Sequence, residues 1–196
     1  MLIITQPLVE ERVCAKEQRE ALISGIVLGI QKITECVPII KIHPRENIED
    51  YKVLLKNQGL HAVPVIHMEI PLYDLLSASD LVVGVSSTAM LEALIFGKIV
   101  IAVNLFGQPS QAGFSSSGAA MSIEDIEELP SIVRSALYDQ NLRARLSDTR
   151  NDYLYEHAYI QDGQASKRVA DLIIQMIEES RKARDGNSYS GNHSYI

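Results

Sequence analysis

The stretch from Leu81 to Gly97 joins a short, largely β-branched apolar run directly to a helical pattern. Leu81 to Val85 suits a strand that is covered on both faces, and Ala89 to Phe96 carries good helix formers up to Gly97. A buried strand that passes into a helix through so short a turn is typical of a parallel sheet covered by helices. This single feature therefore favours an α/β fold.

The same alternation recurs along the chain. Strands are predicted over Leu2–Thr5, Pro38–Ile42, Ala62–Ile66, Leu81–Val85 and Ile99–Val103, and helices over 13–35, Ile48–Gln58, Pro71–Leu76 and Ala89–Phe96. Gly25 and Gly29 are expected to be close-packing positions in the first helix, and Pro64 indicates an edge position or a strand end. We expect a Rossmann-like, three-layer α/β/α fold with a mainly parallel sheet of five to six strands.

The C-terminal part of the chain has a different pattern. Residues 104–118 are predicted to form a long loop, either a lid over a cleft or a surface excursion. From Ile123 to about Glu179 the pattern is helical, and the last helix carries a clear apolar stripe. We expect one domain over residues 1–179, followed by a polar, disordered tail over 180–196.

Composition limits the classes of function. At 196 residues with 46% hydrophobic content, the chain can bury one good core. A formal net charge of −7 argues against a nucleic-acid partner, which needs a broad basic face. Cys14 and Cys36 are too few for a disulfide framework or a zinc site. With no secretory segment and no apolar run near the ~18 residues that span a bilayer, a cytoplasmic location is expected.

The turn before the Ala89–Phe96 helix carries Ser86, Ser87 and Thr88. Free backbone N–H groups and the positive end of the helix dipole favour a phosphate there, and the hydroxyl groups add donors with little bulk. Glu92, one turn further on, can accept from ribose hydroxyls. The alternative is that Ser87 or Thr88 only caps the helix and that Glu92 only complements the dipole.

A basic corner follows the second predicted strand. Lys41, His43 and Arg45 bring positive charge together within five residues, and Pro44 keeps His43 extended at the strand end. Ligands of open parallel sheets bind outside the carboxyl ends of the strands, near the point where the strand order reverses. The corner and the hydroxyl-rich turn together therefore predict an anion site, although a lone histidine is more often structural.

The motif pair formed by His43-Pro44 and Ser86-Ser87-Thr88 resembles that of three groups of bacterial enzymes. These are the sialyltransferases, the capsule Kdo transferases and the CDP-glycerol glycerophosphotransferases, all of GT-B fold. The run from Asp80 to Asn104 is also similar to UDP-N-acetylglucosamine 2-epimerases, which usually have glycines where this chain has Ser87 and Thr88. The resemblance covers roughly residues 2 to 178 and implies the C-terminal, nucleotide-binding half of such an enzyme.

The resemblance also implies a role for each candidate site residue. His43 would be catalytic and contact the phosphate or leaving group, and Glu92 would bind ribose. Phosphate contacts would come from Lys41, Arg45, Ser86, Ser87 and Thr88, and the base would lie beside His67, Met68 and Glu69. The substrate would be a CMP-, CDP- or UDP-linked sugar, and no metal or other cofactor is implied.

Three hypotheses about function follow. The chain is the donor-binding half of a surface-polysaccharide glycosyltransferase or glycerophosphotransferase, half of a sugar-nucleotide 2-epimerase, or a non-catalytic module with the same fold. In the first two, the other wall of the cleft would come from an N-terminal GT-B domain or a partner subunit. The isolated chain would then be inactive, and the full-length enzyme could associate peripherally with a membrane.

Overall fold

The computed structural model of the chain describes residues 1–105 and 113–188. It divides into two compact units, Met1–Leu154 and Tyr155–Ile196. The first unit contains the whole sheet, and the second contains the end of α7 and the long helix α8. Within the described ranges, no helix is both long and apolar enough to cross a membrane.

The first unit is built on one sheet in which every neighbouring pair of strands is parallel. Its strands are β1 (Leu2–Ile4), β2 (Ile39–Lys41), β3 (Val65–Ile66), β4 (Leu81–Gly84), β5 (Ile99–Val103) and β6 (Met121–Ile123). Their order is β3-β2-β1-β4-β5-β6. The five strands predicted from the sequence are confirmed. The sixth, β6, was not predicted as a strand, and it includes Ile123, where the helical stretch was expected to begin.

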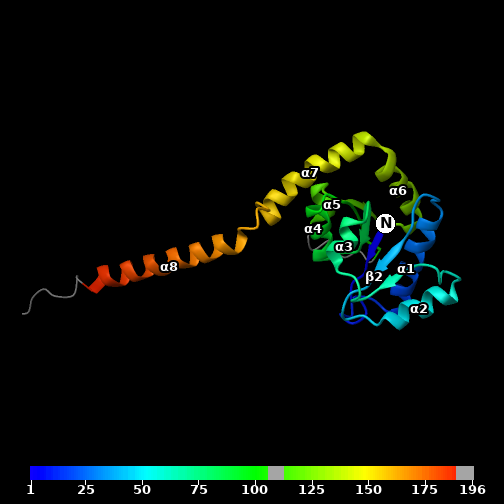
Figure 1. Ribbon diagram of the computed structural model, residues 1–196, viewed down its shortest axis with the longest axis horizontal. Helices are drawn as coiled ribbons and strands as arrows, with labels where there is room; N and C mark the ends of the chain where they lie inside the picture. The colour runs from blue at the N-terminus through cyan, green and yellow to red at the C-terminus, as the bar shows by residue number, and fades with distance from the viewer. Residues whose placement is uncertain (106–112, 189–196) are drawn as a thin grey trace, which may run out of the picture. The chain divides into compact units, whose positions relative to one another are not determined.

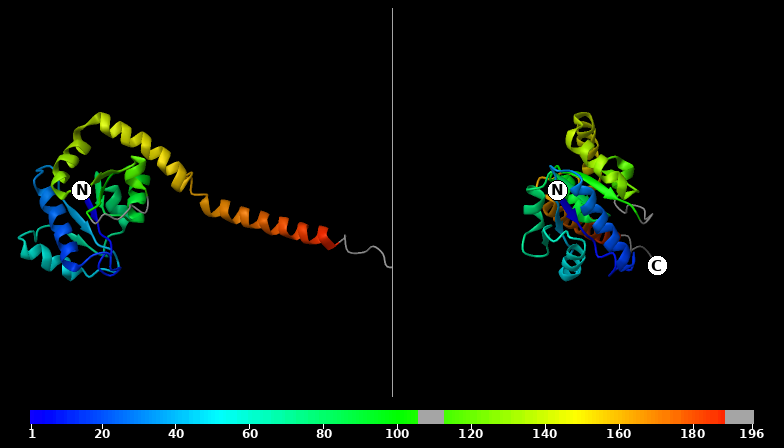
Figure 2. Two further views of the ribbon diagram at one scale, coloured as in Figure 1. Left: turned by 180° about the vertical axis from the view of Figure 1, so that it is seen from behind. Right: turned by 90° about the vertical axis from the view of Figure 1, so that its right-hand side faces the viewer.

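Helices cover both faces of this sheet. They are α1 (Lys16–Gln31), α2 (Ile48–Asn57), α3 (Leu72–Ser77), α4 (Thr88–Ile95), α5 (Phe114–Ser117), η1 (Ile126–Glu128), α6 (Leu129–Tyr138) and α7 (Gln140–Ala158). Helices α1, α2 and α6 lie on one side and α3, α4 and α5 on the other (Figure 1, and from behind in Figure 2). The three-layer α/β/α fold is therefore confirmed.

The core follows from the strand order. The central strands β1 and β4 are buried along their whole length, as expected for strands covered on both faces. Strand β3 lies at the sheet edge and begins directly after Pro64, whose carbonyl oxygen accepts a hydrogen bond from Ile40 N. This confirms the edge position that the proline predicted, because proline has no N–H to offer a further strand.

Two glycines allow α1 to pack closely against the segment after β6. A Cβ atom at Gly25 would lie 2.9 Å from Ile126 Cγ1, and one at Gly29 would lie 3.4 Å from Leu129 Cδ2. Both are close-packing positions, as predicted. The contact fixes η1 and α6 onto the α1 face of the sheet.

The C-terminal part differs from its prediction in three ways. Residues 114–117 of the expected long loop form α5, while residues 106–112 lie outside the described ranges. The helical stretch is divided among η1, α6, α7 and α8 (Ala165–Ser188). Helix α8 continues nine residues into the stretch 180–196 that was expected to be a disordered tail, so 180–188 are helical, and the domain boundary at residue 179 stays a prediction.

We predict opposite effects for alanine at the two glycines of α1. Each substitution gains about 1 kcal/mol of helix propensity. At Gly25 the new methyl group meets the branched side chain of Ile126, which has little room to move, whereas at Gly29 it makes an ordinary contact. Urea unfolding should show Gly29→Ala to be more stable than Gly25→Ala by about 1 kcal/mol or more. Equal free energies of unfolding would contradict this packing.

Candidate functional site

The strand order brings distant segments to one edge of the sheet. Strand β1 pairs in parallel with β2 on one side and with β4 on the other, with Leu2 opposite both Ile39 and Val82. The chain leaves β1 toward one half of the sheet and β4 toward the other, so a crevice opens between their carboxyl ends. The hydroxyl-rich turn and the basic corner both follow strands that end at this crevice.

A pocket of about 270 Å³ lies at these strand ends. Of the predicted site residues, it brings together Lys41, His43, Met68 and Ser87. Its other walls are largely apolar and come from Ile4, Thr5, Pro44, Ile70, Pro71, Leu72 and Ala89. The other predicted residues, Arg45, Ser86, Thr88, Glu92, His67 and Glu69, do not line it. The pocket thus combines polar groups from both sides of the crevice with an apolar surface.

The N-terminus of α4 offers several unused donors. Ser87 is the N-cap, and its Oγ accepts from Ala89 N at 3.2 Å, so its hydroxyl hydrogen remains available. Ser86 N donates to Gln6 Oε1 at 2.8 Å. Within residues 1–105 and 113–188, the backbone N–H groups of Ser87 and Thr88 donate to no acceptor. Ser87 therefore does cap the helix, and the same turn still has donors for an anion.

His43 is held in one tautomer by its own turn. Arg45 N donates to His43 Nδ1 at 3.1 Å. A ring nitrogen that accepts a hydrogen bond carries no proton, so in the neutral ring the proton is on Nε2. His43 is half-buried and lines the pocket, and its neutral ring in this tautomer has one N–H donor, at Nε2.

Lys41 forms a hydrogen bond with the loop after β3. Lys41 Nζ donates to the carbonyl oxygen of His67, and His67 Nε2 lies 3.2 Å from the carbonyl oxygen of Pro44. Burial lowers the pKa of Lys41, and the charge of Glu69 offsets part of that effect. Lys41 thus links the loop after β3 to β2 as well as lining the pocket.

Glu69 and Arg45, two further charged candidates, both have partners within the chain. Glu69 Oε2 accepts from His67 N at 2.8 Å, and hydrogen bonds from the backbone N–H groups of Glu69 itself and of His67 hold the pKa of Glu69 below its ordinary value. Arg45 is exposed and forms an ion pair with Glu11. Its predicted phosphate contact, like every other binding role, stays a prediction.

Glu92 differs from these residues because its carboxylate has no partner. It is half-buried on α4, and burial raises its pKa above the ordinary value. In the part of the chain that the structure describes, its side-chain carboxylate makes no hydrogen bond or ion pair. A carboxylate in this position can accept hydrogen bonds from a ligand.

Sequence reasoning missed three polar residues of the site. Thr5 lines the pocket, Gln6 holds the turn before α4, and the buried Glu46 accepts a hydrogen bond from His43 N at 3.0 Å. Thr5 ends the first predicted strand and Gln6 follows it. Their position at the carboxyl end of a strand could therefore have indicated that they belong to the site. No local pattern marks Glu46, because a charged residue in a turn is normally exposed.

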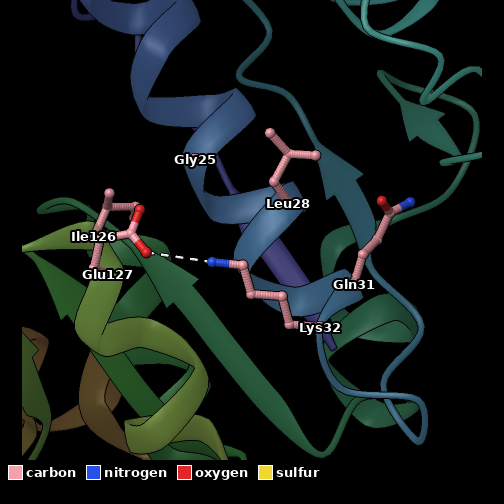
Figure 3. A pocket seen from close by; sticks show the side chains of 7 residues that line it. Gly25, Leu28, Gln31, Lys32, Ile126 and Glu127 are labelled. Carbon is pink, nitrogen blue, oxygen red and sulfur yellow. Dashed lines mark hydrogen bonds and ion pairs between the residues drawn. The ribbon is translucent and has the colours of Figure 1, made fainter.

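A second pocket, of about 410 Å³, lies between α1 and η1 (Figure 3). It is lined mainly by the small and apolar residues that make the close contact of α1, with Lys32 and Glu127 at its rim. Lys32 Nζ and Glu127 Oε2 lie 3.2 Å apart and neutralise each other. This groove has no group of converging donors, so the pocket at the strand ends is the better candidate.

Comparison with known proteins identifies the fold. No family model and no curated protein sequence matches the chain. Among solved structures, the chain is similar to TarM (TM-score 0.59, 15% identity, 86% of this chain and 34% of TarM). It is also similar to UDP-GlcNAc 2-epimerase from Neisseria meningitidis bound to UDP-GlcNAc (0.58, 16%, 89% and 43%). A third is the C-terminal CMP-Kdo binding domain of WaaA from Acinetobacter baumannii (0.53, 12%, 78% and 88%).

These likenesses define the class of the domain. The chain has the Rossmann-like fold of one domain of the GT-B enzymes, which include glycosyltransferases and UDP-GlcNAc 2-epimerases. It spans about a third of TarM and less than half of the epimerase, but it matches nearly the whole of the WaaA domain.

We predict that Glu92→Gln stabilises the ligand-free protein at neutral pH. Burial raises the pKa of Glu92 in the folded state, so its ionisation is less favourable in the folded chain than in the unfolded chain. The ionised side chain therefore lowers the free energy of unfolding, and this loss is fully present at pH values above the folded-state pKa. Urea unfolding at pH 7 should give the variant a higher free energy of unfolding than wild type, by less than about 1 kcal/mol, because solvent screens a half-exposed charge. The difference should vanish near pH 4. A variant less stable than wild type at pH 7 would show that the carboxylate has a stabilising partner.

Proposed function

We propose that this chain is the nucleotide-sugar-binding domain of a surface-polysaccharide glycosyltransferase or glycerophosphotransferase-like enzyme. The observation that carries the proposal is the pocket at the strand ends, where His43, Lys41 and Ser87 converge from both sides of the crevice. Their convergence agrees with the resemblance of the His43-Pro44 and Ser86-Ser87-Thr88 motifs to those of CMP- and CDP-using enzymes.

The unused donors of the α4 turn suit a phosphate group. The N–H groups of Ser87 and Thr88 and the hydroxyl of Ser87 donate to no acceptor within residues 1–105 and 113–188. The helix dipole adds positive potential at the same place. In a chain with a net charge of −7, this local arrangement supplies the attraction for an anion that the overall charge does not.

The chemistry of transfer makes use of His43. Release of a nucleotide from a sugar leaves negative charge on the departing phosphate, and donors aimed at that charge lower the barrier. With Nδ1 accepting from Arg45 N, Nε2–H is the ring donor that His43, a residue of the pocket lining, would offer to the phosphate. His43 can then stabilise the leaving phosphate by a hydrogen bond from Nε2–H.

Glu92 and the loop after β3 would bind the rest of the nucleotide. The unpartnered carboxylate of Glu92 can accept from ribose hydroxyls, which would offset the unfavourable burial of its charge. Met68 and Ile70 present exposed apolar surface at the pocket, against which a base can pack. Backbone groups of the same loop would read the edge of the base.

A 2-epimerase half is the second candidate. The likeness to the Neisseria epimerase covers 89% of this chain, at a TM-score of 0.58. This alternative predicts a preference for UDP, whereas the motif pair favours a cytidine nucleotide. A nucleotide panel distinguishes the two.

We predict that the chain binds a nucleoside mono- or diphosphate weakly and that Ser87→Asp abolishes this binding. Asp and Asn are as good N-caps as Ser, so both Ser87→Asp and the matched control Ser87→Asn should keep the cap of α4. Only Ser87→Asp places a negative charge against the phosphate. Calorimetry with CMP, CDP, UMP and UDP should show affinity lost at least tenfold in Ser87→Asp and largely kept in Ser87→Asn, with similar melting temperatures.

Two results would contradict this assignment. Wild-type protein whose thermal stability and heat of mixing do not respond to any of the four nucleotides has no such site. Equal loss of affinity in Ser87→Asp and Ser87→Asn would indicate that the turn's shape matters and not the anion. Thr88→Ala adds a further check, because Thr88 does not cap the helix and its loss should weaken binding by about 1 kcal/mol while stability is kept.

We also predict that the 196-residue chain has no transferase or epimerase turnover even when it binds nucleotide. Chemistry requires an acceptor and a base that face the donor in a closed, water-poor cleft, and GT-B neighbours such as TarM are much longer chains. Product release from CMP- and UDP-sugars is the assay, with and without acceptor sugars. Multiple turnover by this chain that disappears in His43→Ala would show that the catalytic groups all lie within it.

A further inference from the structure

We propose that Glu46 is the positioning residue for His43, so that a buried carboxylate sets the tautomer of the proposed catalytic ring. The proposal rests on the proposed function for the role of His43, but the geometry stands by itself. The side chain of Glu46 is completely buried, and it lies in the turn that joins β2 to α2. Neither oxygen of its carboxylate faces solvent, and both are used.

One oxygen of the carboxylate holds the backbone of His43. Oε2 accepts from His43 N at 3.0 Å and from the hydroxyl of Thr5. His43 N also lies 3.0 Å from Thr5 Oγ1, so this N–H is shared between two acceptors. Thr5, which follows β1, and Glu46, in the turn before α2, therefore both hold the backbone of His43 at the crevice.

The other oxygen anchors the carboxylate itself. Oε1 accepts from Tyr51 OH and lies 3.7 Å from Arg19 Nη1, while the guanidinium of Arg19 stands over the Tyr51 ring at 5.2 Å. Burial, and after it the charge of Glu46, raises the pKa of Tyr51 far above its ordinary value, so the phenol remains a donor. A buried carboxylate needs such a full set of partners, and this one has them.

The hydrogen bonds of the turn also set the surroundings of the imidazole ring. Glu46 N donates to His43 O at 3.0 Å, so the backbone and side chain of Glu46 together hold both polar groups of the His43 backbone. Arg45 lies inside this closed turn, and its N–H donates to His43 Nδ1. Glu46 thereby keeps Arg45 N where it must be to leave the proton on Nε2. Stability alone does not call for this arrangement, since apolar replacements of buried ion pairs are often neutral or stabilising.

The test reads the tautomer of His43 directly. Long-range ¹H–¹⁵N spectra distinguish the two ring nitrogens, and in the neutral ring of the wild-type protein we expect the proton on Nε2. Glu46→Gln should give a mixture of tautomers and roughly a tenfold loss of CMP or UMP affinity, as expected for losing a charge-assisted hydrogen bond that orders the site. Thr5→Val, which keeps the side-chain volume, should shift the tautomer in the same direction and to a smaller extent.

Ser79→Ala is the matched control. Ser79 is also a buried polar residue, its Oγ donates to Leu75 O, and it precedes β4 at the opposite edge of the sheet from the pocket. It should lower the melting temperature and leave both the His43 spectrum and the nucleotide affinity as in wild type.

The outcomes separate this proposal from the proposed function. An unchanged Nε2–H tautomer in folded Glu46→Gln or Thr5→Val overturns the positioning role, and so does a shift of similar size in Ser79→Ala. If the tautomer shifts as expected but wild-type protein binds no nucleotide, the positioning role holds and the proposed function fails. Should Glu46→Gln not fold, Thr5→Val decides the question by the same spectrum.

Discussion

The pairing of β1 with both β2 and β4 is the constraint on which the rest of the structure depends. Parallel strands end at the same edge, and the chain departs from β1 and β4 toward opposite halves of the sheet. Thr5, His43 and Ser87 are far apart in the sequence, and all three line one pocket for this reason. Any change in that register would separate the hydroxyl-rich turn from the basic corner.

The carboxyl ends of the strands carry polar groups that are partly buried. These groups therefore form hydrogen bonds with one another. Ser87 caps α4, Gln6 accepts a hydrogen bond from Ser86 N, and Glu46 accepts one from His43 N. In each case the acceptor is a side-chain oxygen. Among the residues that the structure describes, these contacts leave the N–H groups of Ser87 and Thr88 and the Nε2 atom of His43 without a hydrogen-bond partner. The same side chain can therefore stabilise the fold with one atom and offer a donor to a ligand with another. For this reason a capping role and a binding role for Ser87 are compatible.

Much of the fold could be predicted from sequence because its signals are local. Buried parallel strands read as short apolar runs, Pro64 marked an edge strand, and Gly25 and Gly29 marked a close contact. The sequence did not reveal β6, whose three residues, Met121–Ile123, follow a stretch rich in Gly and Ser and gain their strand conformation by pairing with β5. Helix α8 extends past the predicted start of a tail because its polar residues are compatible with a helix.

The polar part of the site was predicted less completely, because its partners are distant in the chain. Arg45 was expected at a phosphate, but it pairs with Glu11, which no pattern near Arg45 indicates. Burial of Glu46 depends on Thr5, Arg19 and Tyr51, which come from three different elements. Sequence periodicity indicates which faces are apolar, whereas the pairing of buried charges is decided only when the elements pack.

The location of bound nucleotide decides whether the pocket at the strand ends is the binding site. Amide ¹H–¹⁵N spectra of the uniformly labelled chain, recorded during titration with CMP and with UMP, report which backbone groups contact the ligand. We predict the largest shifts at Thr5, His43, Ser87 and Thr88, around this pocket. Shifts centred on Gly25 and Ile126, in the groove between α1 and η1, or no shifts at millimolar nucleotide, would contradict it.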